Sequence, residues 1–284
     1  MLHMARGPLF ASLAWCLAIA GGLYAQEPPL PEPGAFLAAS LKNLRSNDLV
    51  RSRYTFQDKE TRYTYDSAGR VTKKQVRIYE VTPSPDPELT YRRLVSEDGG
   101  RPADLAKRDS EQQRKEREWL ARRELEGLDV RQARLRKQEI EDQKEQAVVD
   151  ELTSIFDIRM TGREVIDGRP AIVFTLEPRP TYDPRTPQGR IIQHFEGQAW
   201  IDEQEHQLVR LTTEVLETTS VKFGFIVRLL KGSRGRIERR KVDGEAWLPT
   251  YSRFTGSGRV LFVHRIDLDQ ENEYSSYRKR STPE

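Results

Sequence analysis

The side chains that could carry out chemistry in this chain are few and scattered. The histidines beyond the first 25 residues are His194, His206 and His264, and none lies close enough to another to give metal-ligand spacing. Gly256-Ser257-Gly258 is too short for the Gly-x-Ser-x-Gly turn that exposes a nucleophilic serine. Lys231–Gly235 has the wrong residue order for a phosphate loop, so we interpret it as a basic hairpin turn.

The acidic residues give no clearer site. Asp202, Glu203 and Glu205 cluster on an expected turn, but the Asp-x-Asp-x-Asp-Gly alternation of a calcium loop is missing. Nothing singles out a carboxylate pair for glycoside hydrolysis among the 44 acidic residues. The sequence therefore predicts a protein that is not an enzyme, with no catalytic residue, no metal and no cofactor.

The N-terminus has the features of a secretory signal. Arg6 supplies a positive charge, residues 8–24 carry no charge, and Ala25 is a small residue at the expected cleavage point before Gln26. A retained membrane anchor and acylation of Cys16 are the alternatives. Cleavage leaves no transmembrane span and predicts a periplasmic or secreted protein.

Composition limits what the exported chain can bind. Cys16 is the chain's only cysteine, so the protein beyond residue 25 has neither disulfides nor thiolate ligands. Lys and Arg number 47 and Asp and Glu 44, which gives a net charge of +3 with both signs well mixed. This balance argues against nucleic acid as a partner.

The elements follow one another in distinct blocks. A Pro-rich spacer (26–34) precedes an amphipathic helix (35–50), and alternating strands follow from 53 to 97. Residues 103–150 hold 13 acidic and 12 basic side chains, with Gly127 as an interruption, and predict a charged helical hairpin or kinked pair. We expect this insertion to be peripheral and replaceable by a short Gly/Ser bridge.

Strands dominate the remainder of the chain. Asp167-Gly168 and Asp243-Gly244 stand between apolar runs and predict hairpins. About eight short strands between 156 and 280 indicate a largely antiparallel sheet or partial barrel. They include single strands at 221–230 and 260–268, and in an alternative interpretation the latter continues through Tyr274 and Tyr277. The fold class is therefore α+β, with one domain over 35–280 and a short tail at 281–284.

Three of the expected strands, at 171–176, 221–230 and 260–268, are apolar on both faces, although a strand of a sheet with one face in water should alternate apolar and polar residues. Helices such as 35–50 packed on one face would explain this pattern, and an apolar cavity would explain it equally. If a cavity exists, its candidate ligand-binding residues are Phe174, Phe223, Phe225, Ile226, Leu261 and Val263.

Three segments resemble the periplasmic lipoprotein-carrier superfamily (LolA/LolB-like, with RseB-like relatives). These are GREVIDGRPAIVFTLEPRP (162–180), GQAWIDEQEHQLVRLTTEV (197–215) and KVDGEAWLPTYSRF (241–254). The chain is also similar to a group of secreted bacterial proteins that end in Tyr-x-x-Tyr-Arg, as at Tyr274–Arg278. The resemblance implies a curved half-barrel whose concave apolar face, lidded by helices, takes acyl chains.

The function this predicts is non-catalytic binding of a lipid, lipoprotein or other apolar envelope ligand. The alternative is a structural or scaffolding envelope protein, which would use the charged arm at 103–150 to contact an envelope protein partner. An unrecognised hydrolase is a third hypothesis. No site residue of the family can be assigned from the resemblance.

Overall fold

The computed structural model describes residues 28–43, 53–66, 68–84, 90–125, 127–222, 226–260 and 264–280. The predicted signal segment and tail, and residues 44–50 of the predicted helix, lie outside these ranges. The described helices are α1 (Pro33–Asn43), α3 (Leu105–Glu124), α4 (Leu128–Ile155) and the short α5 (Gly189–Ile192). The described strands are β1 (Tyr54–Tyr65), β2 (Val71–Thr82), β3 (Tyr91–Glu97), β4 (Phe156–Ile166), β5 (Arg169–Pro178), β6 (Phe195–Asp202), β7 (Leu208–Val215), β8 (Thr219–Lys222), β9 (Ile226–Leu229), β10 (Arg234–Val242), β11 (Ala246–Val260) and β12 (His264–Lys279).

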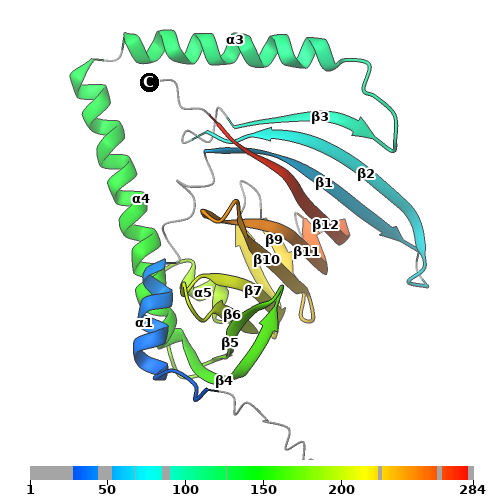
Figure 1. Cartoon of the computed structure of the whole chain (residues 1–284). Coiled ribbons are helices and arrows are strands. Elements are labelled where there is room, and N and C mark those ends of the chain that lie inside the picture. The colour runs from blue at the N-terminus through cyan, green and yellow to red at the C-terminus, as the bar shows by residue number, and fades with distance from the viewer. Residues whose placement is uncertain are drawn as a thin grey trace, which may run out of the picture.

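All the described strands belong to one antiparallel sheet, as predicted (Figure 1). Ten of them form the path β3-β2-β1-β12-β11-β10-β7-β6-β5-β4, while β9 pairs with β11 and β8 pairs with β9. The last strand, β12, lies between β1 and β11, so it joins the N-terminal hairpins to the rest of the sheet. The two ends of the path, β3 and β4, are not paired with each other, and the described sheet is open.

The hairpin predictions are confirmed at both Asp-Gly pairs. Asp167 and Gly168 have φ of 51° and 78°, and Asp243 and Gly244 have φ of 51° and 70°. These left-handed conformations match the twist of the flanking strands and suit Asp and Gly. They fix β4 against β5 and β10 against β11, and so set the register of the central sheet.

The run at 221–230, by contrast, is not the single strand that the sequence predicted. β8 pairs antiparallel with β9, from Thr219 opposite Leu229 to Lys222 opposite Ile226, so the chain reverses within this run. A continuous apolar run carries no period that marks such a reversal. The run at 260–268 is not a single strand either, because Val260 ends β11 and β12 begins at His264. The continuation of the last strand through Tyr274 and Tyr277 is confirmed, since β12 extends to Lys279.

The apolar run at 171–174 is covered on both faces. Ile172 and Phe174 pack with Phe36 of α1 on one face, which we call the inner face. Ala171 and Val173 pack on the opposite, outer face with side chains of the sheet itself, including Trp200 and Trp247. Here the doubled apolar pattern therefore reflects a helix on one side and two tryptophans on the other.

Helices α3 and α4 form the predicted charged arm, with the break between them next to Gly127 (Figure 1). The arm leaves the sheet at β3 and returns at β4, which are the opposite ends of the strand path. A strand spacing of about 4.8 Å puts these ends roughly 40 Å apart along the sheet. A Gly/Ser bridge in place of the arm would have to cross from one edge of the sheet to the other, so the prediction that the sheet folds without the arm needs a bridge long enough for that span.

Candidate ligand-binding face of the sheet

Of the six candidate cavity residues, the structure fully describes one. Phe174 is 2% exposed and stacks on Phe36 with ring centroids 5.9 Å apart. The backbone of Ile226 begins β9, which pairs with the far end of β11. The other four candidates, Phe223, Phe225, Leu261 and Val263, lie outside the described residues, so their place in a cavity stays a prediction.

Phe174 begins an apolar row that crosses four strands of the inner face. Ala199 lies directly opposite Phe174, Leu211 opposite Ala199, and Ile237 opposite Leu211. Directly paired residues of antiparallel strands share one face, so these four side chains form a continuous line, which we call the apolar row. Exposure rises along it, from 2% at Phe174 and 9% at Ala199 to 42% at Ile237.

Helix α1 covers the buried end of the apolar row. Its Phe36 is 4% exposed and lies between Phe174 and His206, whose ring centroid is 4.6 Å away. The amide of Asn43 donates to the backbone carbonyl of Glu205 at 3.0 Å, at the end of the same helix. The aromatic side chain of Phe36 and a few polar contacts, such as that of Asn43, therefore hold much of the described part of α1 against the sheet.

Beyond Ile237 the inner face becomes polar. The next paired residues are Ser252 and then Asn272, which lies opposite Glu60. Glu60 and Asp58 are only 2% and 5% exposed. Together with their hydrogen-bonding and ion-pairing neighbours they form what we call the polar cluster: Asp58, Glu60, Arg62, Arg92, Gln270 and Asn272.

Asp58 has the shortest hydrogen bonds in the polar cluster. Asp58 accepts hydrogen bonds from Asn272 Nδ2 at 2.8 Å and from Arg92 Nη2 at 2.6 Å. The Arg92 guanidinium also lies 4.2 Å from the centre of the Tyr79 ring. A hollow of about 300 Å³ adjoins the cluster, with aromatic walls that include Phe56. Buried carboxylates are costly unless paired, so this end of the face is specialised for polar contacts.

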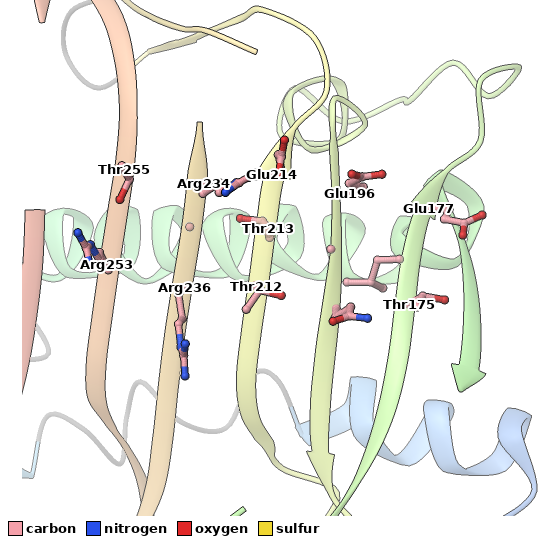
Figure 2. A pocket seen from close by; sticks show the side chains of 14 residues that line it. Thr175, Glu177, Glu196, Thr212, Thr213, Glu214, Arg234, Arg236, Arg253 and Thr255 are labelled. Carbon is pink, nitrogen blue, oxygen red and sulfur yellow. Dashed lines mark hydrogen bonds and ion pairs between the residues drawn. The ribbon is translucent and has the colours of Figure 1, made fainter. Parts of the chain in front are cut away.

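A different hollow, of about 580 Å³, lies over β5, β6, β7, β10 and β11 (Figure 2). Its residues Gln198, Thr212 and Arg236 each neighbour a member of the apolar row along their strand, so their side chains point to the outer face. Glutamates such as Glu214 lie toward one side and arginines such as Arg253 toward the other (Figure 2). This polar hollow is not the apolar cavity that the sequence predicts.

The ionic groups of the outer hollow are partly paired already. Arg234 Nε lies 2.8 Å from Glu214, and Arg253 binds Asp269 with a shortest distance of 2.9 Å. Burial raises the pKa of the Asp269 carboxyl. Hydrogen bonds from Arg253 and Tyr65 lower this pKa by more than burial raises it, so the pKa of Asp269 lies below its usual range. These pairs give the outer face a stable charged surface.

The carboxylates of the acidic turn at 202–205 form ion pairs with basic side chains of the protein. Asp202 pairs with Arg169 at 2.7 Å and Glu203 with Arg163 at 2.6 Å. Glu205 pairs with Lys241 at 2.8 Å, and hydrogen bonds from Lys241 and Trp247 lower its pKa. Among the residues that the structure describes, no group of three or more His, Cys, Asp or Glu side chains is placed to hold a metal ion.

Sequence reasoning did not identify most of the inner-face residues. Leu211 comes from the strand LVRLTTEV and Ile237 from the strongly charged strand RGRIERRKV, so no local signal marks them as partners of Phe174. Glu60 and Asn272 are more than 200 positions apart in the chain and meet only because β1 pairs with β12. Knowledge of the strand register would have been needed to find them.

No family model matches this chain, and no curated protein does either. Solved structures with similar architecture include an outer membrane lipoprotein-sorting protein domain from Vibrio parahaemolyticus, at 8% identity and a TM-score of 0.34, covering 87% of this chain and 93% of that one. A LolA superfamily protein from Nitrosomonas europaea matches at 10% identity and a TM-score of 0.29, covering 88% of this chain and 94% of that one. A chain in the MucA/MucB complex of Pseudomonas aeruginosa matches at 11% identity and a TM-score of 0.23, covering 87% of this chain and 99% of that one.

The superfamily that the sequence segments resemble is thus present among the structural neighbours, as predicted. Within the described ranges, no helix combines the length and the apolar character needed to cross a bilayer.

Proposed function

We propose that this chain is an exported, non-catalytic binding protein that holds an amphipathic envelope ligand, such as a lipid or the acylated end of a lipoprotein. The apolar part of the ligand lies along the apolar row of the inner face, and its polar end points toward the polar cluster. In this proposal the inner face is the concave side of a half-barrel, and α1 is its lid. The rise in exposure from Phe174 to Ile237 is the observation that carries the proposal.

The direction of the row supports an elongated ligand. From β5 to β10 the row crosses three strand spacings, roughly 14 Å, and two further spacings lead to Asn272 on β12. Ile237 is 42% exposed at the open end of the row, where an acyl chain would remove it from water. The buried carboxylates beyond it would reject a purely apolar ligand at that end and favour hydrogen-bonding head groups.

Ile237→Ser tests this proposal. A fluorescent acyl probe should bind the parent protein saturably and should bind the variant about three- to tenfold more weakly, because one apolar contact is lost. Ile237 is half in water already, so thermal unfolding should shift little. Ile140→Ser, on α4 of the arm, serves as the matched control, because Ile140 is 49% exposed, and it should bind the probe like the parent.

Two results would contradict the proposal. One is the absence of saturable probe binding by the parent protein. The other is equal probe affinity for the parent, Ile237→Ser and Ile140→Ser, which would place the probe elsewhere on the molecule. Native mass spectrometry of protein purified from a bacterial envelope would then identify what, if anything, the chain carries.

A further inference from the structure

The corner between α3 and α4 exposes large apolar side chains to water. We define the corner as residues 119–137, on either side of Gly127. Most such side chains in a folded protein are at least half-buried, and clusters of exposed ones mark contact surfaces. The exposed fractions at the corner are 50% for Leu120, 86% for Leu125, 76% for Leu128, 58% for Val130 and 47% for Leu135.

The corner stands away from the rest of the molecule. Both ends of the arm are anchored, since Leu105 near its start is 6% exposed and Ile155 at its end is 1% exposed. A methyl group placed on Gly127 would meet no atom within 4 Å. Figure 1 shows the junction of α3 and α4 projecting beyond the strands. The apolar side chains therefore sit on a convex tip that the fold holds out from the sheet.

Charge along the arm is segregated, although its total is nearly balanced. Residues 119–137 contain six basic and three acidic side chains, whereas residues 138–150 contain one basic and five acidic ones. Arg131 and Lys137 of the corner are exposed. On α4, Leu128, Arg131 and Leu135 are spaced three and four apart, so they lie on one side of the helix. Positive charge and apolar surface thus coincide at the corner.

From this coincidence we propose that the corner docks on an anionic lipid surface. Leu125, Leu128 and Val130 enter the interfacial layer, while Arg131 and Lys137 stay at the level of the phosphates. A fluid lipid layer can surround a convex tip on every side, whereas a protein partner would need a socket shaped to receive it. This surface is separate from the inner face, so the proposal stands or falls independently of acyl-ligand binding.

Vesicle flotation with the exported chain, purified from a bacterial envelope, tests the proposal. Its intact mass is measured first, because the uncharged segment 8–24, if retained, would bind vesicles in every variant alike. The parent should float with vesicles that contain phosphatidylglycerol, should bind phosphatidylcholine vesicles more weakly, and should lose the difference at high salt. The double variant Leu125→Ser/Leu128→Ser should partition at least about tenfold less.

Two further variants separate the contributions. Arg131→Ser/Lys137→Ser should weaken binding to anionic vesicles and leave binding to neutral vesicles unchanged. Val165→Ser removes a side chain that is 72% exposed in β4, away from the corner, and should bind like the parent. Because all these side chains are exposed, thermal unfolding should be the same for every variant.

Three results would overturn the proposal. The first is no flotation of the parent with anionic vesicles. The second is equal flotation of the parent and Leu125→Ser/Leu128→Ser. The third is self-association of the parent but not of this variant in sedimentation, with no vesicle binding by either protein. That result would make the corner an interface between copies of the chain.

Discussion

At the scale of single residues, the buried carboxylate of Glu151 fastens a loop to the end of α4. It accepts hydrogen bonds from the Tyr182 hydroxyl at 3.0 Å, the Arg185 backbone N–H at 2.5 Å and the Thr186 hydroxyl at 2.5 Å. Burial raises the pKa of Glu151, but these bonds lower it by more, so its pKa falls to about 2. The carboxylate therefore stabilises the fold in its charged form.

We predict that Glu151→Gln lowers the free energy of unfolding by about 2–3 kcal/mol at neutral pH, because an amide cannot accept all the bonds of the carboxylate. The folded pKa lies below the unfolded value of about 4.5, so the contribution is fully present above pH 4.5 and is lost as pH falls toward 2. Denaturant unfolding of both proteins across this range measures it. The difference in free energy of unfolding between the parent and Glu151→Gln should disappear at acid pH. Glu145→Gln, on the exposed surface of α4, should have the same free energy of unfolding as the parent throughout.

At the scale of elements, α3 is joined to β3 by one carboxylate. Asp109 of α3 accepts hydrogen bonds from Arg93 Nε at 2.9 Å, from Arg93 Nη2 at 2.8 Å and from the Tyr91 hydroxyl at 2.7 Å. The Arg93 guanidinium and the Tyr91 hydroxyl hold the pKa of Asp109 below its usual range. Burial, together with the Asp109 hydrogen bond, raises the pKa of Tyr91 to about 12. The first turns of an otherwise exposed helix are positioned by this contact.

Asp109→Asn should release the start of α3 from the sheet without unfolding the protein. Amide hydrogen exchange over 105–112 should become several-fold faster, because the bidentate pair with Arg93 is lost. Asp104→Asn is the matched control, since Asp104 pairs with Arg108 within the arm itself, at 2.7 Å. Equal exchange in the two variants would show that Asp109 does not hold the helix.

At the scale of the whole molecule, the arm is the covalent connection between the two edges of the sheet. The piece before the corner contributes β1, β2 and β3, and the piece after it contributes the other described strands. These pieces meet where β1 pairs with β12, from Tyr54 opposite Lys279 to Tyr63 opposite Asp269. The backbone ladder between them does not depend on the arm.

Cutting the arm at the corner should therefore leave one folded molecule. With a protease site inserted next to Gly127, the two fragments should co-elute after cleavage. They should unfold in a single thermal transition whose midpoint lies a few degrees below that of the uncut protein. The uncut insertion variant is the control. Fragments that separate on gel filtration without denaturant would show that the arm, and not the β1–β12 pairing, holds the edges together.

The sequence by itself determined the kinds of element and much of their order. Asp167-Gly168 and Asp243-Gly244 predicted hairpins because their backbone preferences are local, and alternating apolar residues predicted antiparallel strands. The charge density at 103–150 predicted an arm interrupted at Gly127, because a segment so polar has little apolar surface to bury. Such features depend on neighbours within a few positions, so they can be read without the fold.

Only the tertiary structure decided what these elements place together. The apolar row exists because the register sets Phe174, Ala199, Leu211 and Ile237 opposite one another, and a shift of one residue would send each to the other face. The same register carries the inner face across to Asn272, where it becomes polar. The arm joins opposite edges of the sheet because β12 inserts between β1 and β11, a pairing between distant segments that no local pattern specifies.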